Sequence, residues 1–280
     1  MQIDKEVDLF KYSSMRTHSI ASVMYTPRCV EELKEAISMC DKVCHFLGGG
    51  SNVVFASRVE TPIINLMNLD NTLKIIGNNC VIAGCSVRIQ KLINFGKDMA
   101  LGGFEYLFSL PASIGGIVFM NAGRGRVYKQ QISDWLKTIT YLDINDMQLK
   151  TMQVEKTEWT YRHSPFQEMN AVILSATFEL QRLSTEEVAA RIQERKDIVK
   201  ANQEGNKPSC GSVFNRENKY LMRLLRGKRV GGAHFSKKTN NWISNDLGGT
   251  AEDVIALIEY AKKWHKRFGL ECVPEVRIFK

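Results

Sequence analysis

The sequence predicts an α+β protein, because short apolar strands and amphipathic helices follow one another without a regular repeat. Residues 62–66, 72–76 and 80–84 are short apolar runs separated by turn residues, which is typical of strands. Residues 30–37 have apolar side chains at helical spacing and a charged outer face. At 280 residues, the chain is long enough for two or three subdomains.

The remaining elements are expected in the same way. Ser184 and Glu187 form an N-cap signature for a helix that runs to about Gln203, and Thr250 opens a final helix that Gly269 ends. The apolar, glycine-rich segment 101–123 is expected to be buried and turning rather than a surface loop. A further helix is expected at 87–100, and further strands at 43–47, 52–55, 138–144, 171–180, 211–214 and 274–279.

Charge and composition limit the functional classes. No apolar run approaches the length of a membrane span, and the N-terminus lacks the apolar stretch of a signal peptide, so no membrane partner and a cytoplasmic location are expected. The seven cysteines lack paired spacing and histidine neighbours, which predicts reduced thiols and no metal site. The net charge of +8 indicates either a solvated basic face or a surface for a phosphorylated substrate. No RNA-recognition signature accompanies the basic residues, so no nucleic-acid partner is expected.

A glycine turn follows the predicted strand at 43–47. Glycines lack the Cβ that would obstruct a ligand, so consecutive backbone N–H groups at such a turn can bind phosphate. The alternative is a tight strand–strand turn that needs positive φ angles. The glycine turn does not match the dinucleotide-binding fingerprint of alternating glycines, because no helix pattern begins directly after the turn. The turn consists of Gly48, Gly49, Gly50, Ser51 and Asn52.

A second glycine-rich loop lies about 60 residues downstream, inside the apolar segment 101–123. Two backbone-rich loops in one α+β region suit a long ligand with a pyrophosphate and a flat apolar ring. The two loops together therefore favour FAD. The second loop contains Pro111, Ser113, Gly115, Gly116, Asn121 and Gly123.

Several motifs in a fixed order make a family resemblance specific. The chain resembles the UDP-N-acetylenolpyruvoylglucosamine reductase family, in its shorter subtype, and more broadly the FAD-binding fold shared with vanillyl-alcohol oxidase. The matching motifs are GGGSNVVF at 48–55, GGFEYLFSLPASIGGIVFMNAG at 102–123, YRHSPF at 161–166, KPSCGSVF at 207–214, RVGGA at 229–233 and PEVR at 274–277.

The resemblance implies an FAD-dependent oxidoreductase of peptidoglycan precursor synthesis, and hence of cell wall biogenesis, cell shape and cell division. NADPH would reduce FAD, and the reduced flavin would pass a hydride to C3 of the enolpyruvyl ether of a UDP-sugar. The implied proton donor to C2 is Ser212. Arg162 and Glu275 would polarise the enolpyruvyl carboxylate, a task to which the planar fork of arginine is suited.

The resemblance also implies binding residues. Val53 and Ile173 join the two glycine loops as cofactor-binding positions, and the substrate would contact Tyr161, Gly211, Arg216 and Asn245. A monomer is expected. The implied division is an FAD-binding subdomain at 1–70, a second one at 71–182 and a substrate-binding domain at 183–280.

The sequence departs from the family pattern at several places, two of which bear on cofactor and substrate binding. The family's N-terminal Asn-Thr-Phe-x-Ile-Gly-Gly is Arg-Thr-His-Ser-Ile-Ala-Ser at 16–22, and its Lys-His-Ala-Gly-Phe is Lys-Thr-Asn-Asn-Trp at 238–242. Two alternatives therefore stay open: a paralogous flavin oxidoreductase that acts on another nucleotide sugar or anionic small molecule, and a catalytically silent FAD-binding protein. Retention of Ser212, Arg162 and Glu275 together argues against the silent protein.

Overall fold

The computed structural model describes residues 1–124, 129–205, 207–246 and 248–280. The chain forms two compact units, each assembled from separate stretches of sequence. The first unit consists of Met1–Ile3, Tyr25–Gly49 and Ile63–Asp197, and the second of Asp4–Met24, Gly50–Pro62 and Ile198–Lys280. Strands β1 (Gln2–Asp8) and β2 (Ile20–Thr26) and helix α4 (Thr185–Asn202) each contain residues of both units. The three-part division expected from the sequence stays a prediction.

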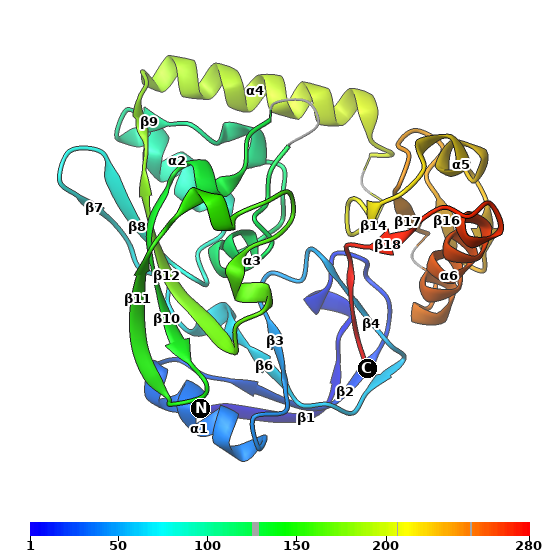
Figure 1. Ribbon diagram of the computed structural model, residues 1–280, viewed down its shortest axis with the longest axis horizontal. Coiled ribbons are helices and arrows are strands. Elements are labelled where there is room, and N and C mark those ends of the chain that lie inside the picture. Colours follow the sequence, from blue (N-terminus) through cyan, green and yellow to red (C-terminus); the bar gives the residue numbers. More distant parts are fainter. Residues whose placement is uncertain (125–128, 206, 247) are drawn as a thin grey trace. The chain divides into compact units, whose positions relative to one another are not determined.

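The first unit is built on an antiparallel sheet with the order β11-β10-β12-β8-β7 (Figure 1). The short helix α3 packs against β12, and the core between them is almost entirely apolar, with Phe166, Ile139 and Phe178 fully buried. The strands are β7 (Leu73–Ile76), β8 (Cys80–Gly84), β10 (Leu136–Asp143), β11 (Gln148–Gln153) and β12 (Ala171–Glu179). The helices beside them are α2 (Ile89–Asp98) and α3 (Ile114–Phe119).

Two further strand pairings belong to the first unit. β3 (His45–Leu47) and β6 (Ile63–Asn65) are parallel neighbours at one end of a second sheet, whose order is β1-β2-β6-β3, and α1 (Val30–Met39) packs on β6. β9 (Leu101–Gly102) and β13 (Gln181–Arg182) are antiparallel. The expected buried, turning character of 101–123 is confirmed, because the segment contains β9 and α3 and much of it lies in the core.

The second unit has its own core. α6 (Ala251–Arg267) packs against the antiparallel sheet β15-β16-β17 and buries Val254, Leu257, Ile258 and Ala261. The sheet consists of β15 (Arg229–Val230), β16 (Ala233–Phe235) and β17 (Ile243–Asn245). The other elements are β4 (Val53–Phe55), β5 (Arg58–Val59), β14 (Phe214–Arg216), α5 (Lys219–Leu224), β18 (Val273–Pro274) and β19 (Arg277–Phe279).

The predicted helix caps are confirmed. Glu187 N donates to Ser184 Oγ at 3.1 Å, and Ser184 N donates back to Glu187 Oε2 at 2.8 Å. Thr250 and Asp253 form the same reciprocal pair at the start of α6. In each pair two N–H groups that have no partner within the helix are satisfied, which fixes where the helix begins.

Two expected strands differ from the structure. β14 begins only at Phe214, because Gly211 has a φ of 74° and Ser212 forms an isolated bridge with Trp242. The expected strand 274–279 is interrupted between β18 and β19. Glu275 N and Val276 N both donate to the Val213 carbonyl, at 2.8 and 3.3 Å, so the chain cannot continue a regular ladder there. Within the described ranges, no helix combines the length and apolar character needed to cross a membrane.

Candidate functional site

The two glycine loops are in direct contact within the first unit. Gly49 N donates to Ser113 Oγ at 3.2 Å. A Cβ on Gly48 would lie 2.7 Å from that hydroxyl, and a Cβ on Gly49 would lie 2.9 Å from Ser113 N. Side chains at 48 and 49 would therefore push the loops apart, so the close approach itself requires glycine at both positions.

The same contact fits a phosphate-binding cradle. Because Ser113 Oγ accepts from Gly49, the Ser113 hydroxyl still has its own proton to donate. Gly115 and Gly116 follow at the start of α3, and a Cβ on Gly115 would come within 3.1 Å of Cys85 Cβ. Within the two loops, backbone groups and one hydroxyl lie at positions occupied by glycine and serine, which suits the FAD pyrophosphate predicted from the two loops.

An arginine that the sequence did not single out lies at this cradle. Arg88 precedes α2, and its Nη1 donates to the Pro111 carbonyl at 2.9 Å. The same nitrogen lies 2.8 Å from where a Cβ on Gly49 would be. The Arg88 backbone also forms a bridge with Ser113. No sequence pattern marks this arginine, because only the fold brings residue 88 to both loops.

Asn121 connects the second loop to the Tyr161–Arg162 turn, also within the first unit. Its side chain is buried, and its Nδ2 donates to the Thr160 carbonyl at 2.8 Å and to Gln131 Oε1 at 2.9 Å. Gln167 Nε2 donates to the Arg162 carbonyl at 2.9 Å and to the Phe119 carbonyl at 3.0 Å. These bonds hold the turn beside the C-terminal end of α3.

The turn itself is short and left-handed. Thr160 and His163 exchange backbone hydrogen bonds, so Tyr161 and Arg162 lie at its tip, and Arg162 has a φ of 60°. The Arg162 guanidinium lies 5.4 Å from the centre of the Tyr161 ring. Tyr161 is exposed, and Arg162 is half-buried. Ile173 lies in β12, with its side chain in the core.

Ser212 and Glu275 belong to the second unit, and their backbones meet. Glu275 N donates to the carbonyl of Val213, the residue after Ser212, at 2.8 Å. Ser212 is exposed and Glu275 is half-buried. Asn52 Nδ2 donates to the Glu275 carbonyl at 3.1 Å, and Val53 pairs with Arg277 in the parallel pair of β4 and β19.

Asn241 fixes the segment that carries Ser212. Its Oδ1 accepts from Phe214 N at 2.8 Å and from Val213 N at 3.2 Å, and its Nδ2 donates to the Phe214 carbonyl at 2.7 Å. The residue is buried and has a φ of 58°. Asparagine adopts a positive φ more readily than most residues, so the residue type at 241 was the one sequence feature that could have indicated this role.

The predicted substrate-binding residues of the second unit lie in different environments. Asn245 is fully buried, and its amide bonds to the backbone of Met15, Arg16 and Gly249. Arg216 lies exposed on β14 and pairs with Glu271 at 3.2 Å. Gly211 directly precedes Ser212. The structure thus uses the Asn245 side chain to hold backbone, and its substrate role stays a prediction.

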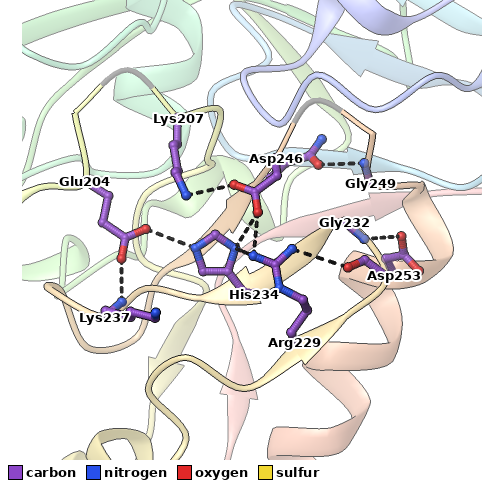
Figure 2. A network of polar contacts seen from close by, with 11 residues as sticks. Glu204, Lys207, Arg229, Gly232, His234, Lys237, Asp246, Gly249 and Asp253 are labelled. Carbon is purple, nitrogen blue, oxygen red and sulfur yellow. Dashed lines mark hydrogen bonds and ion pairs between the residues drawn. The ribbon is translucent and has the colours of Figure 1, made fainter.

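Figure 2 shows an ion-pair network in the same unit, centred on the buried His234. Its Nε2 lies 3.1 Å from Glu204 Oε2, and its Nδ1 lies 3.5 Å from Asp246 Oδ2. Asp246 also pairs with Lys207 at 2.8 Å and with Arg229 at 2.5 Å. Since Lys207 begins the segment that leads to Ser212, the network ties this segment to the β15-β16-β17 sheet.

The two carboxylates of this network are strongly stabilised in their charged form. Hydrogen bonds from Lys207 and Arg229 lower the pKa of Asp246 to about 2. Burial by itself would raise the pKa of Glu204, but the Lys237 N–H and the His234 ring outweigh it and lower that pKa to about 2. Among the described residues, no three His, Cys, Asp or Glu side chains lie close enough together to hold a metal ion.

Comparisons with known proteins cover both units. The family described as "FAD binding domain" matches residues 21–151, and the family described as "UDP-N-acetylenolpyruvoylglucosamine reductase, C-terminal domain" matches residues 203–279. A solved structure of UDP-N-acetylenolpyruvylglucosamine reductase from Thermus caldophilus has a TM-score of 0.82 and 24% identity over 100% of both chains. That likeness confirms the α+β fold predicted from the sequence.

Curated relatives match over nearly their whole length. UDP-N-acetylenolpyruvoylglucosamine reductase 2 of Bacillus cereus is 31% identical over 98% of this chain and 92% of its own. The Listeria monocytogenes reductase is 32% identical over 96% of this chain and 92% of its own. The chain therefore belongs to the UDP-N-acetylenolpyruvoylglucosamine reductase family.

Proposed function

We propose that this chain is an FAD-dependent oxidoreductase that reduces the enolpyruvyl ether of UDP-N-acetylglucosamine enolpyruvate to UDP-N-acetylmuramate. The single observation that carries the proposal is that one chain matches both an FAD-binding domain and the C-terminal domain of this reductase. We further propose NADPH as the reductant and a monomer in the cytoplasm. The product would enter peptidoglycan synthesis and thereby serve cell wall biogenesis, cell shape and cell division.

FAD would be held at the cradle of the two glycine loops. The close approach of Gly48 and Gly49 to Ser113 supports this assignment, as does the Ser113 proton that remains for a phosphate oxygen. When bound, FAD supplies the chemistry of accepting and donating a hydride. The protein's own residues must then bind the substrate and control the proton.

Ser212 would donate the proton to C2 of the substrate. A neutral serine is a weak acid, so it can do this only where its position against the developing carbanion is fixed. The hydrogen bonds of Asn241 to Val213 and Phe214 and the bridge to Trp242 support such a fixed position. The exposed hydroxyl is also accessible to a substrate.

Arg162 would bind the enolpyruvyl carboxylate and stabilise the negative charge that develops during reduction. Its planar guanidinium can meet both carboxylate oxygens at once. Glu275 would act beside that carboxylate, where an ionised side chain would repel it. We therefore expect Glu275 to be protonated in the complex or to act through Arg162.

The cofactor assignment is tested by the absorbance spectrum of the purified protein. Flavin bands, present at once or after reconstitution with FAD, are expected. A protein that shows none under either condition would exclude the proposed function.

The serine assignment is tested by separating the two half-reactions in a stopped-flow instrument. Ser212→Ala should leave flavin reduction by NADPH unchanged and slow flavin reoxidation by UDP-N-acetylglucosamine enolpyruvate at least a hundredfold, in the range expected for loss of a general acid. Ser38→Ala is a matched control, since that hydroxyl lies exposed on α1 and bonds to the Lys34 carbonyl. Unchanged reoxidation in Ser212→Ala would remove Ser212 as the acid.

The departure of residues 238–242 from the family pattern supports a second candidate, a paralogue that acts on another nucleotide sugar or anionic acceptor. Reoxidation by a panel of such acceptors separates the two. Faster reoxidation by any of them than by UDP-N-acetylglucosamine enolpyruvate would favour the paralogue. A flavin that NADPH reduces and no acceptor reoxidises would favour the silent protein.

A further inference from the structure

We infer that Arg88 is the cation that binds the pyrophosphate of FAD, an assignment that rests on the proposed function. The two glycine loops offer backbone groups and a hydroxyl, all of them neutral. The pyrophosphate of FAD carries two negative charges, so a cation at the same place would add a charge-assisted interaction. Arg88 is the residue that the fold brings there.

Three contacts place the Arg88 side chain at the cradle. Nη1 donates to the Pro111 carbonyl at 2.9 Å, at the entrance of the second loop. The same nitrogen lies 2.8 Å from the position of a Cβ on Gly49, so it reaches the first loop as well. The backbone bridge between Arg88 and Ser113, with Ile89 N donating to the Ala112 carbonyl at 3.1 Å, keeps the base of the side chain in register with the second loop.

The charge of Arg88 is available for a ligand. The residue is exposed, and none of the ion pairs between described residues involves Arg88. A guanidinium has five N–H donors, and the Pro111 carbonyl accepts from Nη1. The remaining donors can therefore reach phosphate oxygens while the Pro111 bond keeps the group in place.

A matched set of variants tests the assignment through FAD affinity, without reference to turnover. Arg88→Met removes the charge and keeps most of the apolar stem, and Arg88→Lys keeps the charge without the planar fork. Lys91→Met removes an exposed charge from the first turn of α2, three residues after Arg88, and serves as the control. The dissociation constant of each apoprotein for FAD is measured by flavin fluorescence at 20 mM and 500 mM NaCl.

The expected result is an FAD dissociation constant about 10- to 100-fold higher in Arg88→Met at low salt, which is the range for a hydrogen bond to a charged group. The difference from the wild type should shrink at 500 mM NaCl, because salt screens the exposed charge. Arg88→Lys should lose less affinity than Arg88→Met, and Lys91→Met should stay within about twofold of the wild type.

Three results would overturn the assignment. Equal affinity of the wild type and Arg88→Met would show that the guanidinium does not contact the cofactor. Equal losses in Arg88→Met and Arg88→Lys, independent of salt, would show that Arg88 only supports the Pro111 loop. A wild type that binds no FAD would instead remove the proposed function, and the Arg88 assignment with it.

Discussion

Replacing Asn241 should lower the free energy of unfolding more than replacing the neighbouring Asn240. Asn241 is buried, and its side chain makes three hydrogen bonds to the backbone of Val213 and Phe214. Pro274 lies opposite Phe214 in the pair of β14 and β18, and proline has no N–H. The Phe214 carbonyl therefore finds its donor in the Asn241 amide.

The magnitude follows from what truncation leaves behind. In Asn241→Gly, Val213 N keeps its bond to the Asn241 backbone carbonyl, 3.0 Å away, but Phe214 N and the Phe214 carbonyl both lose their partners. Each buried polar group left unsatisfied costs about 1–3 kcal/mol, so the two groups together should cost about 2–6 kcal/mol. Relative to Asn241→Gly, Asn241→Ala keeps a Cβ at a φ of 58°, which costs about 1–2 kcal/mol. The greater backbone freedom of glycine when unfolded offsets about 0.5–1 kcal/mol of that difference.

The assay is urea unfolding followed by circular dichroism. Asn240→Ala is the control, because the neighbouring asparagine accepts a hydrogen bond from Arg226 Nε at an exposed position and should cost at most about 1 kcal/mol. From most to least stable, the predicted order is wild type, Asn240→Ala, Asn241→Gly and Asn241→Ala. If Asn241→Gly unfolded at the wild-type urea concentration, the hydrogen bonds to Phe214 would not stabilise the fold, and the reasoning would be refuted.

Two further changes have measurable outcomes. Gly49→Ala should weaken FAD binding at least tenfold in fluorescence titration, because the added Cβ would lie 2.9 Å from Ser113 N and separate the loops; affinity within twofold of the wild type would contradict the contact. Glu204→Gln should lower the free energy of unfolding by about 2 kcal/mol at pH 7, because the pKa of Glu204 is lowered to about 2 in the folded protein. This figure allows for the part of the charge interaction that solvent screens. This contribution is present above the unfolded pKa and is lost as the pH falls from about 5 to about 2, so the unfolding free energies of wild type and variant should converge in acid; a constant difference would show that Glu204 acts without its charge.

Local signals predicted much of the fold. The caps at Ser184 and Thr250 placed α4 and α6 within a residue or two, because each cap satisfies N–H groups that only neighbouring residues can reach. Four short strands of the second unit, β5, β15, β16 and β17, were not predicted. Such short strands show no alternating pattern, and only their tertiary partners define them.

The candidate site divides in the same way. Close-approach glycines at 48 and 49 are visible in the sequence, and the structure brings them to Ser113. Arg88 could not be predicted, because its place at the cradle depends on the bridge between residues 88 and 113. The lost N-terminal glycines also have a structural explanation. Ala21 and Ser22 lie in β2, where the backbone is extended and a Cβ is accommodated.

The Val213 carbonyl links the two proposed catalytic groups of the second unit. It accepts from Glu275 N and Val276 N, while the Val213 N–H is held by Asn241. Val213 carries both of these backbone groups, so a shift of this residue moves the backbone of Ser212 and of Glu275 together. Asn241→Gly should consequently alter both the rate of flavin reoxidation and the apparent affinity for substrate, whereas Ser212→Ala should alter the rate alone. A variant at 241 that changed only the rate would mean that Glu275 is positioned independently of this strand.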